Sequence, residues 1–121
     1  MSIKLEIYRG DEPTYILTIK NYGANVNLTG YKIWFTVKES YSDADDDAVI
    51  QMSSADVSEI EILDQTSYKG QVKIYLSKTE TALLSQGTYV FDVQMKTSAG
   101  KILTVVAGDL IVKSDVTLST A

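Results

Sequence analysis

The side chains of this sequence that could carry out chemistry are mainly carboxylates and hydroxyls. There are sixteen aspartates and glutamates, but no histidine and no cysteine. Hydroxyl groups such as those of Ser85 and Thr88 therefore have no imidazole to activate them as nucleophiles. Asp92 lies between Phe91 and Val93, yet the alternation of a strand points it away from the core. We therefore predict no catalytic residue and no enzymatic activity.

An acidic cluster at Asp43, Asp45, Asp46 and Asp47 could supply the oxygen ligands that Ca²⁺ prefers. The cluster lacks the glycine and the glutamate that an EF-hand loop carries at its sixth and twelfth positions. A solvated loop that keeps a sheet edge from pairing is the favoured interpretation. We predict no metal and no cofactor, and whether this loop binds a cation is left open.

The tripeptide Arg9-Gly10-Asp11 has the sequence of an integrin-recognition motif. Between two strands, however, Gly-Asp is also what a turn requires, and Pro13 follows it closely. A match of three residues carries little information. We interpret the segment as a turn.

Composition and charge limit the partners that this chain can have. The 121 residues are 45% hydrophobic and 22% charged, with a net charge of −5, and the eleven lysines and arginines are scattered. Nucleic acid is therefore not an expected partner. No stretch resembles a signal peptide or a membrane-spanning helix, so no membrane is expected either. We predict one domain, 1–121, with its core in 3–117 and a frayed tail at 118–121.

Hydrophobic residues alternate with polar ones in most of the chain, which is typical of half-buried strands. Segment 77–86 is the helical candidate, with Ser77 or Thr79 as its cap. The pattern predicts an all-β protein, an immunoglobulin-like antiparallel β-sandwich of seven to eight strands with one short helical turn near 78–85. A small closed barrel is the alternative. The predicted strands are 3–8, 14–20, 31–39, 49–53, 60–63, 72–76, 87–97 and 101–113.

The strand that begins at Gly87 has a second recognisable feature. Tyr89 follows the glycine by two residues, as in the tyrosine corner of immunoglobulin-like sandwiches. Phe91 then occupies the place of the second cysteine of an antibody domain. This stretch and the strand that folds back on it are expected to organise the core.

One aromatic residue is expected on the outside of the sandwich. If Phe35 faces inward, Trp34 and Thr36 must face outward, and Val90 shares that face in an immunoglobulin-like strand order. Both faces of the last strand are apolar. We assign Ile102 and Val106 to its outer face, and we expect a bulge at Gly108-Asp109.

Trp34, Thr36, Val90, Ile102 and Val106 are therefore predicted to form a protein interface that another subunit covers. The alternative is that the indole lies flat under its own lysines as an isolated surface aromatic.

Several longer segments resemble small proteins of tailed bacteriophages. They are Y-R-G-D-E-P-T-Y (8–15), L-T-G-Y-K-I-W-F-T-V-K (28–38), D-A-D-D-D-A-V-I-Q (43–51), G-T-Y-V-F-D-V-Q (87–94) and G-K-I-L-T-V-V-A-G-D-L-I-V (100–112). Over 3–117 the chain is similar to the immunoglobulin-like N-terminal domain of phage upper baseplate proteins.

The resemblance implies a virion structural protein, made in the bacterial host cytoplasm, in the tail or baseplate or as a decoration of the capsid. Its partners would be other virion proteins and copies of itself in a homo-oligomer. A module that binds carbohydrate or a host surface through the loop residues Tyr22, Tyr41 and Tyr68 is the alternative function.

Overall fold

The computed structural model describes residues 2–40, 42 and 48–113. Its elements are β1 (Ser2–Tyr8), β2 (Thr14–Thr18), β3 (Lys20–Asn21), β4 (Ala24–Asn25), β5 (Lys32–Lys38), β6 (Ile50–Ser53), β7 (Ile60–Ile62), β8 (Gln71–Tyr75), α1 (Lys78–Ala82), β9 (Gly87–Lys96) and β10 (Ile102–Lys113). Eight of these strands correspond to the expected ones. The two-residue strands β3 and β4 form a small hairpin, of which only Lys20 falls within a predicted strand.

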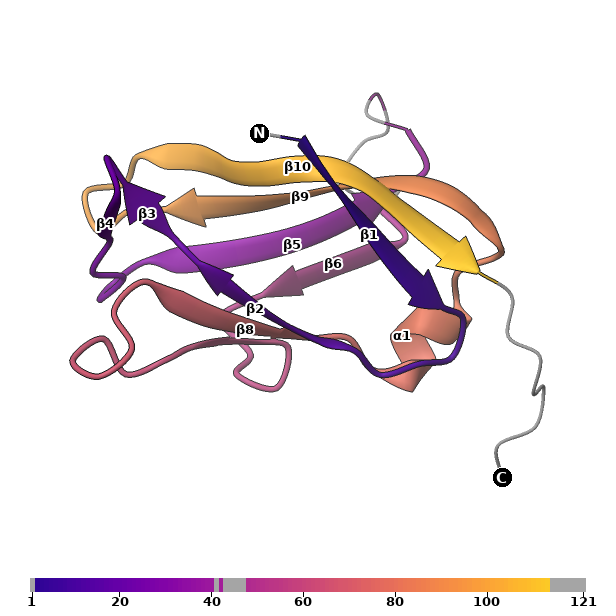
Figure 1. The fold of residues 1–121 in the computed structure, drawn as a ribbon, viewed down its shortest axis with the longest axis horizontal. Helices are drawn as coiled ribbons and strands as arrows, with labels where there is room; N and C mark the ends of the chain where they lie inside the picture. Colours follow the sequence, from indigo (N-terminus) through magenta and orange to yellow (C-terminus); the bar gives the residue numbers. More distant parts are fainter. Residues whose placement is uncertain (1, 41, 43–47, 114–121) are drawn as a thin grey trace.

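Two sheets face each other across one core (Figure 1). The larger sheet has the order β1-β10-β9-β5-β6, and the smaller one has the order β2-β8-β7. This is the immunoglobulin-like arrangement, in which the last two strands and the third long strand share one sheet. The prediction of an all-β sandwich is thereby confirmed.

The alternation in β5 and β9 gives the correct inward faces. Ile33, Phe35 and Val37 of β5 are buried, and so are Tyr89, Phe91, Val93 and Met95 of β9. The rings of Phe35 and Phe91 have their centroids 5.8 Å apart, which places an aromatic contact in the middle of the core.

The N-terminal strand departs from a purely antiparallel sandwich. β1 pairs with β10 in parallel register, from Ser2 opposite Ala107 to Tyr8 opposite Lys113. The chain then turns at Gly10 and crosses to the other sheet, where Thr14 begins β2. Arg9 Nε donates a hydrogen bond of 3.1 Å to the Leu84 carbonyl oxygen, so this arginine fastens the turn to the segment after α1. That contact agrees with a structural role for the Arg-Gly-Asp turn.

The tyrosine corner is present. The Ser85 N–H donates to the Tyr89 hydroxyl over 2.9 Å, and that hydroxyl donates to the Ser85 carbonyl oxygen over 3.1 Å. Just before it, Ser77 caps α1 in a capping box. The Glu80 N–H donates to Ser77 Oγ, and the Ser77 N–H donates to Glu80 Oε1. Of the two caps considered from the sequence, Ser77 is the one used.

Replacing Tyr89 by phenylalanine tests the corner. The change removes both hydrogen bonds to Ser85, and because Ser85 is exposed, water replaces part of them. We expect a loss of about 1 kcal/mol in the free energy of unfolding. Urea unfolding measures it, with Tyr68→Phe on a half-exposed ring as the control. Equal stability of the two variants would show that the corner contributes nothing.

Candidate functional site

The outer face of the larger sheet has a groove of about 460 Å³. The pairing register of β5 with its two neighbouring strands explains which residues meet there. Trp34 of β5 lies opposite Gln94 of β9 and Ser53 of β6, and the next outward residue, Thr36, lies opposite Asp92 and Gln51. The lining residues are Trp34, Thr36, Lys38, Gln51, Val90, Phe91, Asp92, Gln94 and Ile102. The groove therefore combines an indole and two aliphatic side chains with amides, a hydroxyl and charges of both signs.

Trp34 lies half-buried at this surface. Lys32 Nζ is 5.2 Å from the centroid of the indole ring, which is the geometry of a cation–π contact. A lysine thus covers one side of the indole ring, as the alternative interpretation expected. The ring also lines the groove, so it is not an isolated surface aromatic.

Val106 does not belong to this surface, and its assignment to the outer face is wrong. It is 8% exposed and packs in the core, opposite Val93. The cause is a β-bulge between Thr104 and Val106 rather than at Gly108-Asp109. The extra residue, Val105, shifts the phase by one, so Ile102 faces outward and Val106 inward although they are four residues apart.

The structure brings together the other four residues of the predicted interface. Trp34, Thr36, Val90 and Ile102 all line the groove, and Ile102 is 59% exposed. Gln51 and Gln94 also line it but were not singled out from the sequence. Their outward direction followed from the alternation, and the expected strand order placed β9 in one sheet with β5, whereas the pairing of β6 with β5 and the register of these strands were not visible. The role of these residues as an interface stays a prediction.

A second hollow lies beside the start of α1. Glu12, Asp56, Glu59 and Glu80 line it. Three of these carboxylates accept a hydrogen bond from a backbone N–H group. Asp56 accepts from Ser58, Glu59 accepts from Ser53, and Glu80 accepts from Ser77. The hydrogen bonds from Ser58 lower the pKa of Asp56. These carboxylates stabilise turns and a helix cap, so no ligand is needed to explain why they gather at the hollow.

A neighbouring carboxylate on the smaller sheet also has a partner. Tyr75 of β8 donates a hydrogen bond of 2.6 Å to Glu61 of β7, and this bond raises the pKa of the Tyr75 hydroxyl. The pair joins two strands across the outer face of that sheet. It is therefore structural.

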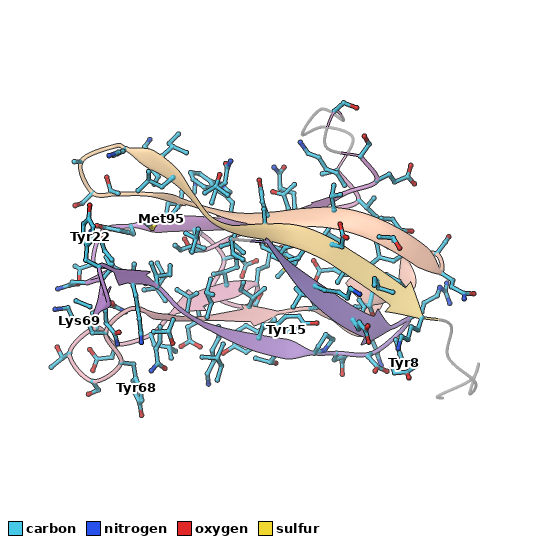
Figure 2. The ribbon with its side chains drawn as sticks, turned by 45° about the horizontal axis from the view of Figure 1, so that its top comes forward. Tyr8, Tyr15, Tyr22, Tyr68, Lys69 and Met95 are labelled. Atoms are coloured by element: carbon cyan, nitrogen blue, oxygen red, sulfur yellow. The ribbon has the colours of Figure 1, made fainter. Side chains whose placement is uncertain are left out.

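Of the three loop tyrosines, Tyr22 and Tyr68 belong to the described residues. Tyr22 and Tyr68 lie at the same end of the molecule, near Lys69 (Figure 2). Tyr41 and the acidic segment 43–47 lie outside the described residues. Within 2–40, 42 and 48–113, no three acidic side chains are grouped closely enough to hold a metal ion. No helix in those ranges is both long and apolar enough to cross a bilayer.

Comparisons with known proteins identify the fold class. No family model matches the chain, and no curated protein matches it. Among solved structures, the crystal structure of CopC from Methylosinus trichosporium OB3b is similar, with 16% sequence identity and a TM-score of 0.50. The match covers 98% of this chain and 91% of CopC. At this identity the likeness shows a common fold.

This comparison contradicts the predicted function as a phage virion structural protein. One solved structure that it finds is that of CopC, a copper-binding protein, and CopC is not a virion component. Tail, baseplate and capsid roles accordingly have no support. The resemblance to the phage baseplate domain rested on loose strand patterns, which unrelated β-sandwiches share. That resemblance stays a prediction.

Proposed function

We propose that this chain is a non-catalytic binding domain whose partner is a second copy of itself, held on the outer face of the larger sheet. The observation that carries the proposal is the groove over Trp34. Its volume of about 460 Å³ lies within the range of ligand sites. Tryptophan is also among the residues that dominate the binding energy of protein interfaces.

The composition of the groove favours a protein partner. Trp34, Val90 and Ile102 provide apolar surface, while Gln51, Gln94 and Thr36 provide donors and acceptors. Apolar anchors among hydrogen-bonding side chains are typical of protein interfaces. Lys38 and Asp92 place both signs of charge in one groove, so a copy of the same chain can offer complementary charges.

The likeness to CopC does not bring a copper site to this chain. Copper sites in proteins use imidazole, thiolate and thioether ligands. The sequence has neither histidine nor cysteine. Met52 and Met95 face the core, with exposures of 0% and 8%. The described donor set therefore does not fit copper.

A charged side chain placed in the groove tests the proposal. In Thr36→Arg the guanidinium enters the groove from the middle of β5, and we expect a monomer at concentrations where the unmodified chain associates. Trp34 is the only tryptophan, so its emission reports directly on the groove. On dilution the emission of the unmodified chain should shift to longer wavelength as water reaches the indole.

Thr18→Arg is the matched control, because Thr18 is an exposed residue of the smaller sheet. We expect this variant to associate like the unmodified chain in light scattering. An unmodified chain that is monomeric at every concentration, with constant Trp34 emission, would refute the proposal.

A further inference from the structure

The hairpin formed by β3 and β4 presents Tyr22 entirely to solvent. Tyr22 is 101% exposed and has φ +52°, and the next residue, Gly23, has φ +80°. Positive φ at both central residues is the pattern of a type I′ turn, which favours Asn-Gly. Tyrosine is strained in this conformation. In the described part of the chain, no other residue except glycine has a positive φ.

The turn therefore does not explain why residue 22 is a tyrosine. An asparagine would adopt the same backbone with less strain. Strained residues that the surrounding structure holds in place gather at functional sites. A fully exposed aromatic ring also has no packing role in its own domain. Both observations favour a role in contact with another molecule.

The base of this hairpin is firmly attached to the rest of the molecule. The Ile19 N–H donates to the Gly70 carbonyl over 2.7 Å, and Asn25 Nδ2 donates to the Lys69 carbonyl over 2.9 Å. The Val26 N–H donates to the Ile19 carbonyl over 3.0 Å. The hairpin thus holds Tyr22 at one end of the molecule (Figure 2), and little conformational freedom would be lost when Tyr22 binds.

The Trp34 groove offers what a tyrosine side chain needs. The indole can pack against the phenol ring, and Ile102 provides an exposed aliphatic wall. The side-chain amides of Gln51 and Gln94 can form hydrogen bonds with the tyrosine hydroxyl, which prefers a hydrogen-bond partner when it is buried.

The charges of the two surfaces are also compatible. Segment 19–27 contains Lys20 and no carboxylate. Asp92 in the groove can therefore face Lys20. Lys38, which also lines the groove, can donate to the asparagine side-chain oxygens of the hairpin.

We propose that the Tyr22 hairpin of one copy enters the Trp34 groove of the next copy. This inference rests on the proposed function and specifies the occupant of its site. The Tyr22 hairpin and the Trp34 groove are different surfaces, so the contact is head-to-tail. Repeating this contact gives a ring or a filament rather than a two-fold dimer.

Tyr22→Asn separates this contact from folding. Asparagine suits the left-handed backbone, so the melting temperature should stay unchanged or rise. Self-association should weaken by about 30-fold or more, as expected for a central aromatic anchor. Tyr68→Asn, at the same end of the molecule, is the control and should associate normally. Analytical ultracentrifugation measures both.

Mixing two defective variants gives the sharper test. Tyr22→Asn keeps an intact groove, and Thr36→Arg keeps an intact hairpin. Each alone should be monomeric, while their mixture should form a one-to-one dimer that grows no further. Failure of the mixture to pair would overturn the head-to-tail contact.

The outcomes distinguish this inference from the proposed function. If Thr36→Arg abolishes association and Tyr22→Asn does not, the hairpin is not the occupant and the groove remains the binding surface. If neither variant changes association, or the unmodified chain does not associate at all, both proposals are wrong.

Discussion

Gly70→Ala should destabilise this protein by about 3 kcal/mol. A Cβ at position 70 would lie 2.7 Å from the Ile19 carbonyl oxygen, 3.2 Å from Asn25 Cβ and 3.3 Å from the Val26 nitrogen. Two of these three atoms are backbone, so they cannot rotate away. The φ of +84° adds the strain of a left-handed conformation. Thermal unfolding should show a fall in melting temperature of about 10 °C.

Gly10→Ala is the matched control for this prediction. Gly10 has nearly the same φ, +87°, but no atom lies within 4 Å of its built Cβ. It should therefore show the conformational cost alone, about 1 kcal/mol. The difference between the two variants measures the steric contact at Gly70. Equal losses would mean that the base of the β3–β4 hairpin yields to the added methyl group.

Leu84→Ala is expected to lower the free energy of unfolding by about 3–5 kcal/mol. The side chain of Leu84 is 0% exposed and belongs to the core cluster, so its removal leaves a cavity. The adjacent Leu83 is 66% exposed. Leu83→Ala should therefore change stability by less than about 0.5 kcal/mol. Urea unfolding of both variants measures this contrast between neighbouring leucines.

Similar losses for both leucine variants would contradict the assigned burial. The segment after α1 would then have to pack differently. In that case the hydrogen bond from Arg9 to the Leu84 carbonyl would also need to be reconsidered.

Much of the fold was predictable because alternation is a local property. The sequence of β5 places lysines, tryptophan and threonine on one face of the strand and Ile33, Phe35 and Val37 on the other. Burying two lysines would be costly, so the inward face follows from the residues alone. The same reasoning correctly oriented β9 and found the tyrosine corner at Tyr89.

The β3–β4 hairpin was missed because its turn residue is unusual. A Tyr-Gly pair is a weak turn signal compared with Asn-Gly, and the strands have only two residues each. The capping box of α1 was recognisable, since Ser77 and Glu80 have the required spacing. The bulge at Val105 had no comparable signal, because any residue of an apolar strand can be the unpaired one.

By itself the sequence determined the class of fold, the inward faces of β5 and β9 and the outward position of Trp34. These depend on side-chain periodicity, which each strand carries within a few residues. Only the tertiary structure decided that Val106 joins the core, that Leu84 rather than Leu83 is buried, and that Gln51 and Gln94 meet beside the indole. Those outcomes depend on register and on a bulge, which arise from pairing between segments far apart in the chain.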